Sequence, residues 1–370
     1  MGRAERQVFV IDKIQALIDG CSQGLAERRP LVEAIVLAAV AREHVLLIGP
    51  PGTAKSEAAR RVARSFGGNY FEYLLGKFSE PSELFGPVDL RLLKEGVLET
   101  VTQGMLPEAE IAFLDEVFAG SSAILNTLLG ILNERIFRRG SRQVHCPLRV
   151  CIGATNSLPE DEVLAAFADR FLIRCFVEPV SDHLLETMLE GGRQAFEPLS
   201  VPLTELDQLA EQARAVRLQE VRPLLGMLLR RLRKEGIGLS DRRSVRVQNL
   251  VAAAAALAGR QQASPADLWP IVLAVPTASG QQRARQCLEE ELRSSDSPCL
   301  WSLAEETASA PKVRARRLVA EGQRLLQLQP EPERELRIEG LLREIDASLL
   351  PAQWGHELEQ VRARLVESLA

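Results

Sequence analysis

One octapeptide constrains the fold of this 370-residue chain more than any other part of its sequence. A continuous apolar run at residues 45–48 leads into a loop, and a helical pattern follows at 55–66. A short apolar run that stops at a cluster of glycine and proline is typical of a buried strand meeting a tight loop. Strand, loop and helix in this order predict a Walker A phosphate-binding loop. Its residues are Gly49, Pro50, Pro51, Gly52, Thr53, Ala54, Lys55 and Ser56.

This loop predicts ATP and Mg²⁺ as ligands. Its backbone N–H groups and the N-terminus of the following helix would surround the phosphates. Lys55 would reach the β- and γ-phosphates, and Ser56 would ligate Mg²⁺. Ala54 stands where a glycine usually precedes the lysine, and its methyl group is tolerable if that residue is already helical. The alternative interpretation is an ordinary Gly/Pro turn with an exposed lysine.

A pair of carboxylates follows sixty residues after the loop lysine. Four apolar residues at 111–114 predict a buried strand, and Asp115 and Glu116 come directly after it. Open α/β sheets bind their ligands at the carboxyl ends of the strands. Asp115 would hold Mg²⁺ through water, and Glu116 would orient and polarise the attacking water. An apolar run that ends in Asp-Glu is common by itself, so the prediction depends on the phosphate loop.

Two further residues are candidates for the chemistry. Asn156 follows a predicted strand at 149–154, where its amide could reach the γ-phosphate or the attacking water. Arg170 precedes a predicted strand at 171–177, where it would lie at the edge of the domain and could enter a neighbouring subunit's ATP site. An arginine in that role stabilises the charge of the transition state. The alternatives are a turn-capping role for Asn156 and an ion pair between Arg170 and Asp169.

The order of apolar runs predicts an α/β fold followed by helices. Strands that alternate with helices favour a parallel sheet covered on both faces. Strand signals stop near residue 180, so we expect a nucleotide-binding domain at 1–185, a helical lid at 186–275 and a helical C-terminal region at 276–370. Within the last region, 277–311 has the composition of a linker. The predicted strands are 45–48, 70–75, 110–114, 149–154 and 171–177.

Composition and charge disfavour several classes of protein. With 45 Lys and Arg against 50 Asp and Glu, the chain has a net charge of −5, which disfavours a protein that coats duplex nucleic acid, although a local basic groove is compatible with it. No apolar stretch approaches the ~20 residues that a transmembrane helix needs, and the N-terminus has no secretory pattern. The six cysteines lack metal-ligand spacing. We therefore expect a cytoplasmic protein with reduced cysteines.

Longer motifs around these residues resemble the MoxR family of AAA+ ATPases, and most closely its RavA-like branch. The resemblance extends over roughly residues 8–275. It rests on GPPGTAKS at 49–56, FEYLLGKFSEPSELFGP at 71–87, GMLPEAEIAFLDE at 104–116, AILNTLLGILNERIFRRG at 123–140, ATN at 154–156, ADRF at 168–171 and SDRRS at 240–244. It implies an AAA+ αβα core with a five-stranded parallel sheet, an all-helical lid, and a hexameric ring with ATP at the subunit interfaces.

The resemblance also assigns roles to individual residues. Lys55 and Ser56 match the Walker A residues, Asp115 and Glu116 the Walker B pair. The matches that complete the site are Asn156 as sensor 1, Arg170 as the arginine finger and Arg242 as the sensor 2 arginine, with the adjacent Arg243 as the alternative. Two insertions, at 91–101 and 136–148, match hairpins that point toward the pore or a partner surface in related rings.

The implied function is ATP-driven remodelling or chaperone-like activation of a client protein, usually alongside a partner that carries a von Willebrand factor A (vWA) domain. Helicase-like rings share the same core, so a nucleic-acid motor is one alternative. A scaffold that binds ATP without hydrolysing it is another, although Glu116 argues against it. A motor subunit of a metal chelatase is a third.

Overall fold

A computed structural model describes residues 3–96, 99–139, 142–192, 196–308, 310–327, 332–347 and 355–369. Its centre is a five-stranded parallel sheet in the order β2-β3-β6-β1-β7. The strands are β1 (Val45–Ile48), β2 (Tyr70–Leu74), β3 (Ile111–Asp115), β6 (Val150–Thr155) and β7 (Ile173–Phe176). The predicted α/β fold and all five predicted strands are therefore confirmed, with ends that differ by one or two residues.

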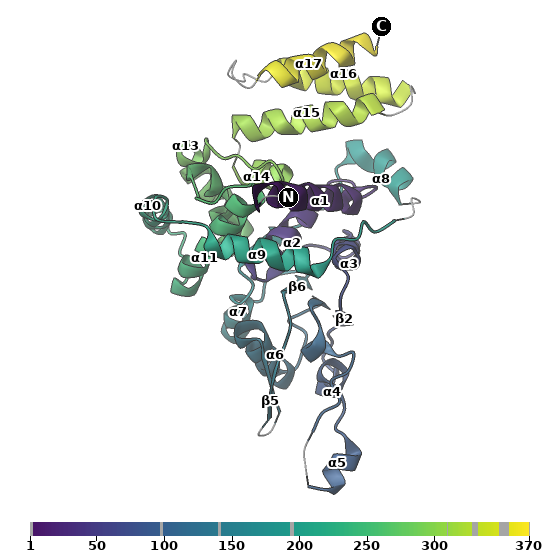
Figure 1. Ribbon diagram of the computed structural model, residues 1–370, viewed down its shortest axis with the longest axis vertical. Coiled ribbons are helices and arrows are strands. Elements are labelled where there is room, and N and C mark those ends of the chain that lie inside the picture. The colour runs from purple at the N-terminus through teal and green to yellow at the C-terminus, as the bar shows by residue number, and fades with distance from the viewer. Residues whose placement is uncertain are drawn as a thin grey trace.

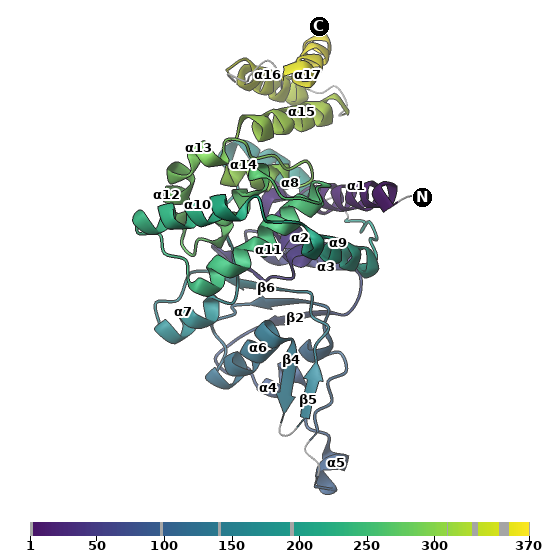
Figure 2. The same cartoon turned by 60° about the vertical axis from the view of Figure 1, so that its left-hand side comes forward.

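Helices cover both faces of this sheet (Figure 2). Helices α1 (Arg3–Ser22), α2 (Arg29–Ala41) and α3 (Lys55–Phe66) lie on one face, and α6 (Ser122–Glu134) lies on the other. Successive side chains of a strand point to opposite faces, so β1 contributes Val45 and Leu47 to the first hydrophobic core and Leu46 and Ile48 to the second. Burial on both faces explains why this strand is a continuous apolar run.

A two-stranded hairpin and a short helical arm extend from the αβα core. The hairpin pairs β4 (Ile136–Arg139) with β5 (Arg142–His145), as predicted, although its turn at 140–141 lies outside the described residues. The other insertion differs from the prediction of two short strands. Its first half is the helix α5 (Leu90–Lys94), and an isolated antiparallel bridge joins Val88 to Thr100 at its base.

The N-cap of α5 explains why the arm begins as a helix. The side chain of Asp89 accepts hydrogen bonds from the backbone N–H groups of Arg91 and Leu92, and both donors would otherwise be unpaired at a helix start. Residues 97–98, in the expected second strand, lie outside the described range. In both views α5 lies at the end of the molecule farthest from the C-terminal helices, beyond α4 (Pro81–Phe85) (Figures 1 and 2).

After the short helix α8 (Leu185–Gly191), the next helices pack on the same core as α1 and α2. They are α9 (Leu203–Ala215), α10 (Arg222–Lys234) and α11 (Asp241–Leu257). Leu209 of α9 and Leu250 of α11 belong to one continuous cluster of buried residues with Ile35 of α2. A carboxylate adds a polar tie, because Glu43 accepts hydrogen bonds from Arg246 and Asn249 of α11. The predicted lid and the nucleotide-binding region therefore share the first of the two hydrophobic cores.

The stretch at 277–311, predicted to be a linker, is instead packed and helical, so that prediction is wrong. It forms α12 (Ala278–Cys287), α13 (Glu289–Leu292) and α14 (Trp301–Thr307), with Leu288 and Leu303 buried in the main core. Glu33 of α2 is fully buried and accepts a hydrogen bond of 2.7 Å from the backbone N–H of Leu303. Burial raises the pKa of Glu33 to about 8, partly offset by an ion pair with Arg29.

Three helices with a core of their own complete the chain. The helices α15 (Pro311–Gln327), α16 (Pro332–Ala347) and α17 (Gly355–Glu367) form a layer beyond α14 (Figure 1). Gly322 permits a close contact between α15 and α17, because a Cβ there would lie 2.3 Å from Cγ1 of Val361. The predicted helical C-terminal region is confirmed. Across the described residues, no helix has both the length and the apolar character that crossing a membrane requires.

Candidate active site

The predicted phosphate loop connects β1 to α3 at the C-terminal edge of the sheet. A Cβ on Gly49 would lie 2.1 Å from the carbonyl oxygen of Val177, so a side chain does not fit there. Gly52 has φ +80°, in the left-handed region that favours glycine. In the described part of the chain, no residue accepts a hydrogen bond from the N–H groups of Gly52, Thr53 or Ala54. These free donors, just before a helix N-terminus, fit the phosphates of a nucleotide.

Lys55 is folded onto this loop. Its Nζ donates hydrogen bonds of 2.7 Å to the carbonyl oxygens of both Gly49 and Pro50, and the residue is buried. Burial lowers the pKa of Lys55, whereas the nearby carboxylates Asp115 and Glu116 act in the opposite direction. The ammonium and the two carboxylates therefore belong to one site. A nucleotide phosphate would offer the ammonium a stronger, charged acceptor than the two carbonyls.

Ala54 does not have a right-handed helical conformation. It is the N-cap of α3, and its backbone is left-handed, with φ +61° and ψ +21°. A residue with a Cβ pays roughly 1–2 kcal/mol in this conformation. The methyl group is therefore accommodated at a backbone position that favours glycine, and the condition of a helical Ala54 is not met.

The acid pair lies at the end of β3, and Asn156 directly follows the neighbouring strand β6. Asp115 is the last residue of β3, and its Oδ1 accepts a hydrogen bond of 3.0 Å from the N–H of Glu116. Glu116 has φ +47°, which turns the chain sharply at the strand end. Its Oε1 accepts a hydrogen bond of 2.6 Å from Nδ2 of Asn156. The structure thus brings together three residues from the ends of two neighbouring strands.

The residues fit a magnesium nucleotide on chemical grounds. Mg²⁺ prefers oxygen ligands and usually keeps several waters, so one hydroxyl, one carboxylate and phosphate oxygens form a suitable set. Ser56 is the second residue of α3, directly after Lys55, and Asp115 is near that lysine. These two residues would hold the ion between the loop and the acid pair.

Arg28, which no motif of the sequence indicates, binds the backbone of the phosphate loop. The residue is 6% exposed, and its Nε donates a hydrogen bond of 2.9 Å to the carbonyl oxygen of Thr53. Its Nη2 donates to the carbonyl oxygen of Glu178, just beyond β7. These contacts span 25 and 150 residues, so no local pattern predicts them. Arg28 fixes the orientation of a loop peptide and ties it to the segment that leaves the sheet.

Arg170 lies away from the phosphate loop. It precedes β7, whereas the loop follows β1, and these parallel strands pair with Val45 opposite Ile173 and Ile48 opposite Phe176. The four residues of β7 span about 13 Å. Arg170 is therefore at the opposite edge of the sheet from the loop. Its Nε is buried without a hydrogen-bond partner in the described part of the chain, and the ion pair with Asp169 that was the alternative for Arg170 is absent there.

The two adjacent lid arginines differ in their surroundings. Arg243 is 1% exposed and donates hydrogen bonds to the carbonyl oxygens of Phe171, Leu172 and Ala274. The side chain of Arg242 is 40% exposed, with Nη1 3.8 Å from Oδ2 of Asp169. Arg243 therefore joins the lid to the sheet, and Arg242 is the one that can reach a ligand. Both lie at the same sheet edge as Arg170.

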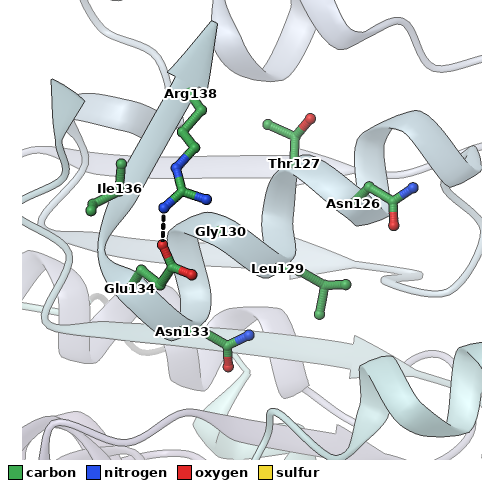
Figure 3. A pocket seen from close by; sticks show the side chains of 8 residues that line it. All are labelled: Asn126, Thr127, Leu129, Gly130, Asn133, Glu134, Ile136 and Arg138. Carbon is green, nitrogen blue, oxygen red and sulfur yellow. Dashed lines mark hydrogen bonds and ion pairs between the residues drawn. The ribbon is translucent and has the colours of Figure 1, made fainter. Parts of the chain in front are cut away.

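A separate hollow of about 400 Å³ lies between α6 and β4, outside the predicted site (Figure 3). An ion pair between Glu134 and Arg138 crosses it. The hollow is open and mostly lined by polar side chains of one helix face. The lining residues are Asn126, Thr127, Leu129, Gly130, Asn133, Glu134, Ile136 and Arg138.

The fold, together with the sheet edge that carries the phosphate loop and the acid pair, defines a P-loop nucleotide-binding domain. A glycine-containing loop between a central parallel strand and a helix, with an acid pair at the end of another strand, is the defining arrangement of that class. Comparison with a solved structure agrees with this fold. A crystal structure of a candidate ATPase from Cytophaga hutchinsonii superposes with a TM-score of 0.63 at 17% identity, covering 79% of this chain and 97% of that one.

Sequence comparisons then specify the family. Residues 12–214 match the model of bpMoxR, the MoxR domain in the MoxR-vWA-beta-propeller ternary systems. An uncharacterised protein of Methanocaldococcus jannaschii is 35% identical over 70% of this chain and 69% of its own. The chaperone MoxR1 of Mycobacterium tuberculosis is 27% identical over 59% of this chain and 53% of its own length. The chain therefore belongs to the MoxR family of AAA+ ATPases, and it spans about half of the chaperone.

Proposed function

We propose that the chain hydrolyses Mg-ATP at sites that two subunits of an oligomeric ring complete together. The separation of the predicted site residues supports this proposal most directly. Lys55, Asp115 and Glu116 lie at one edge of the sheet, and Arg170 and Arg242 lie at the opposite edge. A single subunit whose sheet lies between the two sets cannot apply both to one nucleotide. A neighbouring copy in a ring can supply the second set.

Within one subunit, the sheet edge with the phosphate loop would bind the nucleotide and activate the attacking water. The N–H groups of residues 52–54 and the Lys55 ammonium would hold the phosphates, and Mg²⁺ bound by Ser56 and Asp115 would neutralise phosphate charge. Glu116 would accept a hydrogen bond from the attacking water and orient it. The amide of Asn156, which now donates to Glu116, keeps that carboxylate at the end of the strands.

The opposite edge would act on the neighbour's nucleotide. Arg170 has no carboxylate partner among the described residues, so its charge is not neutralised within the subunit and would be available to a phosphate. A finger arginine stabilises charge that develops on the transferred phosphoryl group and contributes ~10³-fold or more in rate. We infer that Arg242 acts with it in trans, because the lid helix places Arg242 beside Asp169, which precedes Arg170 in the chain.

We propose that the ring is hexameric and that turnover drives chaperone-like remodelling of protein complexes with a vWA-domain partner. The partner is supported by the matching family model, whose MoxR domains come from systems with vWA and β-propeller components. The chaperone role is supported by the similarity to a MoxR chaperone. Membership of the RavA-like branch remains a proposal. A chelatase-like motor and a nucleic-acid motor are the alternatives, which protein pull-down and DNA-stimulated turnover would separate.

Steady-state ATPase activity against protein concentration tests the shared site. We expect specific activity to rise with concentration, and Arg170→Ala to bind ATP with wild-type affinity but to turn over at least ~10³-fold more slowly. Mixing Arg170→Ala with Glu116→Gln should restore part of the activity, because each supplies the group that the other lacks. Arg214→Ala, at an exposed surface pair with Glu211, is the matched control. Concentration-independent activity that survives Arg170→Ala would contradict the proposal.

A further inference from the structure

We propose that Asp169 is a positioning residue that holds the lid arginine Arg242 beside the finger Arg170, so that a subunit presents both guanidinium groups to its neighbour as one unit. The inference rests on the proposed function, in which both arginines act across a subunit boundary. Asp169 itself would touch neither ATP nor Mg²⁺.

The carboxylate of Asp169 is the meeting point of the sheet and the lid helix α11. Ser240, the N-cap of α11, donates from Oγ to Oδ2 at 3.0 Å and is 3.3 Å from Oδ1. Arg243 Nη1 lies 3.4 Å from Oδ1, and Arg242 Nη1 lies 3.8 Å from Oδ2. The residues lie more than 70 positions apart in the chain. One acidic side chain thus contacts three of the four residues at the start of α11, namely Ser240, Arg242 and Arg243.

The same residue is linked to the finger through the backbone. Asp169 is the C-cap of α7 (Glu162–Ala168), and its N–H donates to Ala165. Arg170 follows directly, with its own N–H donating to Phe167 at 3.0 Å. A displacement of the Asp169 carboxylate therefore acts on the peptide that carries Arg170. The hydrogen-bonded cap, and not proximity alone, couples Asp169 to Arg170.

Charge gives Asp169 a second effect. Arg242 and Arg243 both approach this one carboxylate, and like charges this close repel each other unless an anion lies between them. The Asp169–Arg242 pair is long and partly exposed, with side chains 25% and 40% exposed, and pairs of this kind are weak. Asp169 can therefore hold Arg242 in place and still release it to a triphosphate, which carries more charge.

The test is a mutant cycle measured as ATPase turnover and as affinity for an ATP analogue that cannot be hydrolysed. Asp169→Asn keeps the shape and can accept from Ser240, but loses the charge that holds Arg242. We expect kcat to fall about fivefold, which is the ratio that corresponds to the loss of one partly exposed ion pair. The affinity of the variant's phosphate loop for the ATP analogue should not change. In an Arg242→Ala background, Asp169→Asn should cause no further loss. Asp161→Asn, the N-cap at the other end of α7, is the matched control.

A mixing experiment separates positioning from damage to the fold. Asp169→Asn subunits mixed with Glu116→Gln subunits should regain turnover, because the Glu116→Gln neighbour presents intact arginines to a hydrolysis-competent site. A misfolded variant cannot be rescued in this way. Should Asp169→Asn fail to fold, Ser240→Ala removes the strongest contact while keeping the charge, and we expect a smaller fall in kcat with the same rescue.

Two results would overturn the inference. One is wild-type turnover of Asp169→Asn, and the other is a full additional loss when Asp169→Asn is combined with Arg242→Ala. Failure of the proposed function gives a different signature, because Arg170→Ala would then keep its activity. An inactive Arg170→Ala protein together with a fully active Asp169→Asn protein would reject the role of Asp169 alone.

Discussion

Replacing Arg243 with alanine tests whether the two neighbouring lid arginines have separate roles. The guanidinium of Arg243 is buried and donates to three backbone carbonyl oxygens, at 2.7 Å to Ala274, at 3.0 Å to Phe171, and to Leu172. Truncation leaves the carbonyl oxygens of Leu172 and Ala274 without this donor, at about 1–3 kcal/mol each, whereas the carbonyl oxygen of Phe171 keeps a hydrogen bond from Nε of Arg174. Part of that cost is offset because the buried charge is removed as well. We therefore expect Arg243→Ala to lower the free energy of unfolding by roughly 3–5 kcal/mol.

Thermal unfolding followed by circular dichroism measures this loss. For a chain of 370 residues, a loss of that size corresponds to a Tm lower by about 4–6 °C. Arg242→Ala is the control from the next position in the chain, and we expect its unfolding free energy to stay within about 0.5 kcal/mol of wild type because the side chain is 40% exposed. Arg243→Lys should be intermediate, since one ammonium cannot reproduce the guanidinium fork. Equal Tm values for Arg243→Ala and wild type, or an equal loss for Arg242→Ala, would refute the reasoning.

Three further predictions concern stability. Burial raises the pKa of Glu33 from 4.5 to about 8, so the folded chain keeps a proton that the unfolded chain releases, and the stability from that proton is lost as pH rises from 4.5 to 8. The Tm of Glu33→Gln should therefore rise relative to wild type between these pH values, and a constant difference would contradict the burial argument. Ala54→Gly should relieve the left-handed backbone and raise the unfolding free energy by up to about 1 kcal/mol; a fall of similar size on chemical denaturation would exclude that strain. Gly322→Ala should destabilise the C-terminal helices by clashing with Val361, whereas Gly340→Ala, which meets nothing within 4 Å, should stabilise them by about 0.5–1 kcal/mol, and limited proteolysis reports both.

Local features of the sequence predict the central sheet well. Strand β1 is apolar at every position because both faces are covered, and the loop after it contains glycines where the backbone and Val177 require them. The hydrogen bond from Asn156 to Glu116 follows from the same logic. Both residues lie at the carboxyl ends of strands that turn out to be neighbours. The family resemblance adds the roles of these residues, which geometry alone does not assign.

The errors occur where distant parts of the chain decide the structure. Residues 277–311 have the composition of a linker. They are nevertheless packed against the main core, and Glu33 accepts a hydrogen bond from one of them. The insertion at 91–101 matches a hairpin by its sequence, but the Asp89 cap makes its first half helical. The choice between Arg242 and Arg243 depends on the rotation of α11 about its axis. That rotation is fixed by carbonyl groups about 70 residues earlier in the chain, which no local pattern reveals.

The shared core of the lid and the nucleotide-binding region has a consequence for motion. Two bodies joined by a hinge can rotate apart without disturbing their interiors, but α9 and α11 share buried side chains with α2 and would have to separate from them. Close-packed interiors resist such displacement. We therefore expect a pair of fluorescent labels on α2 and α11 of one subunit to keep its distance through the nucleotide cycle. If the proposed ring forms, labels on adjacent subunits should report the change instead.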